Sequence, residues 1–401
     1  MTTGQPVLRS LRPPDLPQVF DLLRTCFVGT PADHFVKQHL YDSTFRPWQG
    51  RVAEMDGRIV AYVRIFDRRM RVRGVPLRAA GIGSVATHPD FRHRALASAL
   101  LTDAIGVMER RGYAISFLYT GVMPLYERLG WRVVAQPYLR APVAEAAGMG
   151  ADRTYAVRGF DVADLPAIRR VFSRATRGAT GAVVRNERYW RDHFWWANDD
   201  PRFFLVAERQ GRIVAYLRGQ VEAQRQRLVV LECETLPSAR GAARALIAEA
   251  ARRASTLGLT MVYCQAPADS AIADAFRACP GAESRPTGRA PDMQLLVRPD
   301  RVLRGLLPAL RRAARETPGP AAALAIGDVG VRLSAEDAEF VVPPGANAVR
   351  LDRYDAVLAL LGQRSVVECL EPRTPASAAA IDRLEAALPP CAYHFWYPDR
   401  I

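Results

Sequence analysis

An internal repeat constrains the fold of this 401-residue chain more than any other feature. Residues 52–64 read VAEMDGRIVAYVR and residues 206–218 read VAERQGRIVAYLR, so ten of thirteen positions are identical. Each copy has the pattern of a strand, a glycine-containing turn and a second strand. Because self-similarity of this kind marks a duplicated structural unit, the sequence predicts two copies of one fold.

Matching segments flank both hairpins in the same order. An Asp-Leu-Pro unit precedes each hairpin, at residues 15–17 and 164–166, and indicates a helix start with Asp as the cap and Pro in the first turn. Ala- and Leu-rich segments follow at residues 96–112 and 242–258, with the apolar spacing of helices and a glycine at the end. We therefore expect mixed α+β units, each with a central sheet flanked by helices.

The chain divides into three predicted domains. The two copies occupy residues 1–145 and 150–295, and a Pro-rich stretch separates them from residues 300–401. That third region is predicted to be a small α+β domain, with helical segments at 302–315, 354–361 and 377–388 and strands within 322–333 and at 338–342.

Composition excludes several other classes of protein. No apolar run approaches the roughly 20 residues of a membrane-spanning helix and no export signal is visible, so we expect a soluble, cytoplasmic protein without a membrane partner. The net charge of +14 comes almost entirely from arginines dispersed along the chain, which disfavours a nucleic-acid partner. Neither the six cysteines nor the His, Asp and Glu residues show the spacing of metal ligands, so no metal is expected.

A strand-turn-helix segment carries the first chemical signal. The strand ends at Val85, Ala86 and Thr87, and the turn and helix start contain His88-Pro89-Asp90-Phe91 followed by Arg92, His93, Arg94, Ala95, Leu96, Ala97 and Ser98. Free backbone N–H groups and the helix dipole at such a turn favour a pyrophosphate. The segment resembles the acetyl-CoA motif of the GNAT superfamily. This resemblance implies that residues 85–87 pair with the pantetheine arm and that residues 92–98 hold the pyrophosphate.

One position departs from that motif. The family has glycine where this chain has Ala95, and glycine suits a site where a backbone must approach phosphates closely. The alanine either weakens the affinity for the cofactor or only shifts the cofactor slightly, and we expect the slight shift.

A second segment strengthens the resemblance. After a predicted strand at 114–119, Thr120 and Gly121 open a stretch that continues VMPLYERLGW. This resembles the closing GNAT motif, in which a tyrosine stands near the cofactor sulfur. The resemblance implies that Tyr126 is the general acid that protonates the departing thiolate and that Thr120 and Gly121 contact the cofactor. A tyrosine that only packs a helix on the sheet is the alternative.

The second copy lacks both motifs, which predicts a degenerate lobe that serves as a scaffold. Its aromatic cluster has two interpretations, a wall of the acceptor pocket or ordinary core packing. The cluster comprises Tyr189, Trp190, Phe194, Trp195 and Trp196.

The order of the three domains resembles the Eis (enhanced intracellular survival) acetyltransferases, whose third domain is similar to sterol carrier proteins. That resemblance implies a homo-oligomer, a hexamer or a trimer, and acceptors such as aminoglycosides, polyamines or lysine side chains. It also implies that the C-terminal carboxylate, here that of Ile401, is the general base. The aromatic tail before it predicts docking rather than fraying, and His394 is either an alternative base or packed.

The sequence thus predicts an N-acetyltransferase that uses acetyl-CoA and a small-molecule or peptide amine. Acidic residues such as Asp21, Asp33 and Glu127 either attract the cationic amine or only solvate the surface. A non-catalytic sensor that binds coenzyme A or a lipid is the alternative function.

Overall fold

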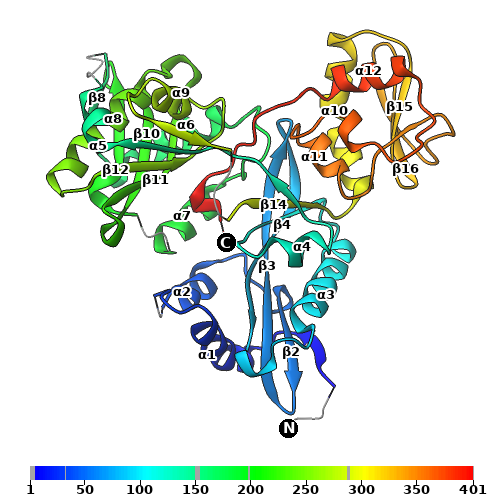
Figure 1. The fold of residues 1–401 in the computed structure, drawn as a ribbon, viewed down its shortest axis with the longest axis horizontal. Helices are drawn as coiled ribbons and strands as arrows, with labels where there is room; N and C mark the ends of the chain where they lie inside the picture. Colours follow the sequence, from blue (N-terminus) through cyan, green and yellow to red (C-terminus); the bar gives the residue numbers. More distant parts are fainter. Residues whose placement is uncertain (1–4, 32, 150–153, 197–198, 287–289, 401) are drawn as a thin grey trace.

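The computed structural model describes residues 5–31, 33–149, 154–196, 199–286 and 290–400. In this part of the chain the strands form two seven-stranded sheets and one four-stranded sheet. Figure 1 shows three lobes, each built on one sheet with helices packed against it, and the C-terminal end lies where the lobes meet.

The first sheet has the order β1-β2-β3-β4-β5-β14-β6. Its strands are β1 (Val7–Ser10), β2 (Gly50–Met55), β3 (Arg58–Val72), β4 (Val75–Thr87), β5 (Ile115–Tyr119), β14 (Asp292–Leu296) and β6 (Arg132–Val134). The helices of this lobe are α1 (Leu16–Cys26), α2 (His34–Tyr41), α3 (Leu96–Arg110) and α4 (Met123–Glu127). The apolar face of α3 packs on the sheet through Leu100, Leu101 and Ala104, all fully buried, as the spacing predicts.

The second sheet repeats this arrangement in the order β13-β7-β12-β11-β10-β9-β8. Its strands are β13 (Glu283–Arg285), β7 (Tyr138–Pro142), β12 (Met261–Gln265), β11 (Arg227–Thr235), β10 (Arg212–Glu222), β9 (Leu205–Arg209) and β8 (Ala156–Gly159). The helices are α5 (Val143–Gly148), α6 (Leu165–Ala175), α7 (Glu187–Trp196), α8 (Ala242–Thr256) and α9 (Ala271–Arg277).

The third lobe is a smaller α+β unit whose sheet has the order β17-β16-β15-β18. The strands are β15 (Ala322–Ile326), β16 (Val329–Leu333), β17 (Ala338–Val341) and β18 (Val349–Arg350). The helices are α10 (Pro299–Glu316), α11 (Ala356–Leu360) and α12 (Ala378–Ala387). This lobe shares a continuous apolar core with the first one, which contains Leu77 of β4 and Leu306 of α10.

The two large sheets exchange a strand. β7 is at the end of the first repeat in sequence but lies between β13 and β12 of the second sheet, and β14 is at the end of the second repeat but lies between β5 and β6 of the first. The predicted ranges 1–145 and 150–295 therefore each give one strand to the other sheet.

The same ion-pair trio marks both repeats and corrects one expectation. Asp15 stands before α1, yet its carboxylate makes no capping bond to that helix. It accepts instead from the backbone N–H of Arg12 at 2.7 Å and from the Arg9 guanidinium at 2.6 Å, and Arg9 also pairs with Glu54. The equivalent trio of the second lobe is Arg158, Asp164 and Glu208.

Among the helices that the structure describes, none combines the length and the apolar character needed to cross a bilayer.

Candidate functional site

The strands β4 and β5 separate at the centre of the first lobe. Their parallel pairing covers Ala79–Gly81 of β4 and Ile115–Phe117 of β5, while β4 continues to Thr87. Ser84 has a φ of 52°, and the register of β4 against β3 shifts at the same place, so a β-bulge bends the strand there. The backbone of β4 beyond Gly81 is thereby available on its β5 side, and an extended chain can insert between the two strands.

The N-terminus of α3 lies at the end of this gap between β4 and β5. The first α-helical bond of α3 runs from the Ala99 N–H to the Ala95 carbonyl oxygen at 3.0 Å, so the amides of residues 96–98 have no partner within the helix. Arg92 and Arg94 are exposed beside these amides and form no ion pair with a carboxylate of the described residues. Free amides, a helix dipole and two guanidiniums together favour a polyanion.

Two residues of this turn have left-handed backbone conformations. His93 has a φ of 62° and Ala95 a φ of 56°. An L-residue with a side chain adopts this region at a cost, whereas glycine does so freely. The structure therefore gives a further reason for the glycine preference at position 95, one of backbone conformation. The side chain of Leu96 is buried in the core, so that residue offers only its backbone to a ligand.

Tyr126 lies on α4, directly after the end of β5. Its side chain is 7% exposed and packs edge-on against Trp131, with ring centroids 5.9 Å apart. Burial raises the pKa of Tyr126 to about 12, and a side-chain hydrogen bond with Thr120 opposes the rise. The phenol is therefore protonated at neutral pH and is held next to the first residue beyond β5.

The C-terminal tail docks between the lobes, as its aromatic composition predicts. Tyr393, Phe395 and Trp396 are each at most 2% exposed. Arg400 is buried and forms a bidentate pair with Asp292, at 2.8 and 3.0 Å. Since Asp292 is the cross-strand neighbour of Tyr119, the tail reaches the end of β5. Ile401, the predicted source of the general base, lies outside the described residues.

The corresponding region of the second lobe is occupied by the tail. The parallel pairing of β11 with β12 ends at Val230 and Cys264, as in the first lobe. The carboxylates beyond that point are engaged: Glu232 pairs with Arg185 at 2.7 Å, and Glu234 accepts from the Trp396 indole at 2.7 Å.

The start of α8 in the second lobe also differs from that of α3. Gly241 has an ordinary helical φ of −60°, and the Ala243 amide donates to the carbonyl oxygen of Arg240. Arg240 itself pairs with Asp274. The amides of Ala243 and Arg244 are thus bonded to the carbonyl oxygens of Arg240 and Gly241, unlike the amides at the start of α3.

The ring of His394 is held by the second lobe. Its Nε2 lies 2.6 Å from a Glu234 oxygen, on the second lobe. Burial lowers the pKa of His394, but the charge and the hydrogen bond of Glu234 outweigh that effect, so the net pKa is raised. This contact ties the tail to the second lobe.

The other described candidates contact the second core, the tail or neighbouring surface residues. Trp190 is in the second core against Phe172, and the Tyr189 hydroxyl donates to Asp399 of the tail. The side chains of Phe194, Trp195 and Trp196 lie outside the described residues. Asp21 and Asp33 pair with exposed neighbours one helical turn away, and Glu127 is exposed, as surface residues would be.

Comparisons with known proteins agree with this geometry. Residues 7–134 match the family model for an acetyltransferase (GNAT) domain, and residues 165–277 match that of the acetyltransferase (GNAT) family. The chain thus carries two GNAT domains in tandem, and the protein is an acyltransferase. GNAT enzymes use acetyl-CoA and act on amines. No curated protein matches the sequence.

Solved structures share the fold over the whole chain. A GCN5-related N-acetyltransferase from Anabaena variabilis has a TM-score of 0.74 at 15% identity, over 96% of this chain and 97% of that one. Another from Kribbella flavida has a TM-score of 0.72 at 18% identity, over 100% and 99%. Eis1 from Mycobacterium abscessus has a TM-score of 0.67 at 15% identity, over 99% and 100%.

Sequence reasoning missed the residues that the tail brings to β5. Asp292 and Arg400 stand 108 positions apart and only the exchange of β14 places them together. An acidic residue at the start of an apolar strand, and an arginine next to the terminus, were the only local signals.

Proposed function

We propose that the protein transfers the acetyl group of acetyl-CoA to a primary amine, with the first lobe as the catalytic one. The observation that carries this proposal is the gap between β4 and β5, which ends at an exposed helix N-terminus with two arginines that form no ion pair with a carboxylate of the described residues. The pantetheine arm is an extended chain with amide groups, so it would pair with Val85, Ala86 and Thr87 as a strand does. The pyrophosphate would lie on residues 92–98.

The other two lobes have supporting roles in this proposal. The second lobe, residues 150–295 in the sequence-based division, is a degenerate GNAT unit that docks the tail. Residues 300–401 form the sterol carrier-like domain, and the α+β arrangement of four strands and three helices supports that assignment. The protein would act in the cytoplasm as a homo-oligomer.

The proposed chemistry is direct attack on the thioester. A neutral amine nitrogen bonds to the acetyl carbon while the backbone N–H near Val85 stabilises the oxyanion. The carbon–sulfur bond then breaks, and the thiolate receives the phenolic proton of Tyr126. The nitrogen releases one proton, which restores the phenol through solvent, so the products are an amide and free coenzyme A. Thr120 and Gly121 would border the reacting sulfur.

The amine must first lose a proton from its ammonium form. We propose the carboxylate of Ile401 as the base, and the position of Arg400 beside Tyr119 supports this role. A free carboxylate has a pKa near ~3.5, so the base would act through a water molecule or in a desolvated setting.

The test measures coenzyme A release and acetyl-CoA affinity in parallel. Tyr126→Phe should lower kcat about a hundredfold, because one general acid contributes at least that much, while the Kd of acetyl-CoA stays within about threefold. Tyr155→Phe, in the second lobe, is the matched control and should match wild type.

A second variant tests the base. Two residues appended after Ile401 move the carboxylate and should also lower kcat, whereas the same residues added before Met1 should not. If every amine fails with the wild-type enzyme although acetyl-CoA binds, the coenzyme A sensor replaces the enzyme as the best interpretation.

A further inference from the structure

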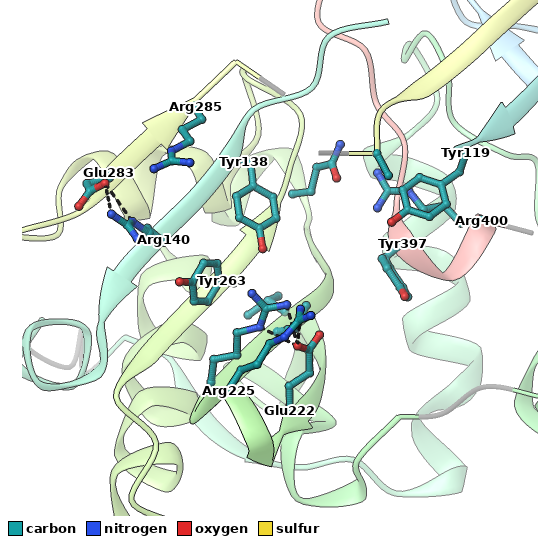
Figure 2. Close-up of a pocket in the computed structure, with 15 residues that line it drawn as sticks. Tyr119, Tyr138, Arg140, Glu222, Arg225, Tyr263, Glu283, Arg285, Tyr397 and Arg400 are labelled. Atoms are coloured by element: carbon teal, nitrogen blue, oxygen red, sulfur yellow. Dashed lines mark hydrogen bonds and ion pairs between the residues drawn. The ribbon is translucent and has the colours of Figure 1, made fainter. Parts of the chain in front are cut away.

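A cavity of about 810 Å³ lies between the first two lobes and the tail. Tyr119 from β5 contributes one end, β7, β11 and β12 contribute the walls, and Tyr397 and Arg400 of the tail close it on the first-lobe side. Figure 2 shows Tyr119, Tyr397 and Arg400 grouped at one end and Arg140, Glu283 and Arg285 at the other. The volume is typical of a small-molecule site.

The cavity is rich in arginine. Arg140, Arg225, Arg227, Arg285 and Arg400 line it, together with only two carboxylates, Glu222 and Glu283.

Those carboxylates are already paired within the wall. Glu222 accepts from Arg227 at 2.8 Å and lies 3.4 Å from Arg225, and Glu283 accepts from Arg140 at 2.9 Å. Arg400 is neutralised by Asp292 behind it. Arg285 forms no ion pair with a carboxylate of the described residues, so the wall keeps an excess of positive charge.

The remaining surface is aromatic. The rings of Tyr138 and Tyr263 lie 5.6 Å apart at the centre of the cavity, where Figure 2 shows them facing the open space. Burial raises the pKa of Tyr119 and of Tyr138, so both phenols stay neutral and add no negative charge. A ligand here would meet flat apolar faces and guanidinium groups.

One end of the cavity lies at Tyr119, the last residue of β5. The Arg400 guanidinium stacks on the Tyr119 ring at 4.6 Å, and the residue after Tyr119 is Thr120, which interacts with Tyr126, the acid of the proposed function. A molecule in the cavity could therefore present an amine at its Tyr119 end while its other groups contact the arginines.

We propose that the acceptor is an amine that also carries an anionic group, a carboxylate or a phosphate ester, which the arginines of this cavity bind. The proposal rests on the acetyl transfer proposed above. Like charges repel in such a partly enclosed space, so polycationic acceptors such as polyamines are disfavoured.

Matched acceptor pairs test this with the full-length protein. Glucosamine 6-phosphate is compared with glucosamine, tyrosine with tyramine, and spermidine serves as the polycation. We expect kcat/KM to be at least about tenfold higher for an anionic member than for its partner, since a charge-assisted hydrogen bond contributes about that factor. A preference only in the glucosamine pair identifies phosphate, and one only in the tyrosine pair identifies carboxylate.

Variants tie the preference to the cavity. Arg285→Gln and Arg225→Gln should each lower the anionic-to-neutral ratio of kcat/KM about five- to tenfold, whereas Arg312→Gln, on the exposed face of α10, should leave it unchanged. The KM of the anionic acceptor should also rise with salt.

Two results would overturn the proposal. Spermidine or the neutral members could be the better substrates, or the ratio could be the same in Arg285→Gln, Arg225→Gln and wild type. Either outcome leaves the acetyl transfer standing. Absence of turnover with all five amines, despite acetyl-CoA binding, would instead remove the proposed function itself.

Discussion

Replacing Ala95, the N-cap residue of α3, by glycine should stabilise the protein. Ala95 has a φ of 56°, and the left-handed region costs an L-residue about 1–2 kcal/mol. Glycine avoids this cost but gives the unfolded chain more freedom, which offsets about 0.4–1 kcal/mol. The free energy of unfolding should therefore rise by about 0.5–1 kcal/mol.

The matched control is the same substitution one helical turn later. Ala99 is half-buried within α3, where its N–H donates to Ala95, and Ala99→Gly should cost about 0.5–1 kcal/mol. Differential scanning calorimetry of wild type and both variants should place Ala95→Gly about 1 °C above wild type and Ala99→Gly below it.

The cofactor gives a second readout for the same pair. Loss of the Ala95 methyl brings the backbone of the turn closer to any phosphate, so the Kd of acetyl-CoA should fall or stay constant in Ala95→Gly. If Ala95→Gly lowers the melting temperature as much as Ala99→Gly does, the left-handed conformation of residue 95 is refuted.

Two further outcomes are expected. Glu234 raises the pKa of His394 in the folded protein, so the contribution of this pair to stability is full below about pH 6.5 and is lost as the pH rises through the folded pKa. Between pH 6 and 9 the melting temperature of wild type should therefore fall more than that of His394→Gln. An equal fall in the two proteins would refute the pairing. Gly130 has a φ of 99°, and an added Cβ would overlap the Tyr354 ring. In chemical denaturation, Gly130→Ala should therefore lower the free energy of unfolding by more than about 2 kcal/mol. Gly148 has open space around it, so the control Gly148→Ala should lower it by less than about 0.5 kcal/mol.

The sequence predicts the local elements well because their signals are local. The spacing of apolar residues in 96–112 and 242–258 indicates α3 and α8, whose bounds differ from the prediction only at the glycine end. Asp15 shows the limit of such reasoning. Its type and place fit a helix cap, but Arg9, on a neighbouring strand, competes for the carboxylate and holds it.

The candidate site is predicted only in part, for a physical reason. The motif around Tyr126 is contiguous, so its helix and its neighbour Thr120 follow from the sequence. The arginine cavity is not contiguous: its arginines lie between positions 140 and 400, and along the chain they look like part of a dispersed basic excess. Only the pairing of β7 with β12 and β13 brings them to one wall.

The strand exchange also determines the order in which this protein can fold during synthesis. The first sheet lacks β14 until residue 296 has left the ribosome, when nearly all of the second repeat has been made, and until then β5 and β6 expose unpaired edges. The strand pairing of the first lobe thus cannot be completed before the second lobe has been synthesised. The contacts between β5 and β14 that complete the first sheet join residues more than 170 positions apart. Such long-range pairing is slow. The exchange of β7 and β14 between the two sheets should therefore limit the refolding rate of the intact chain, rather than the folding of either repeat by itself.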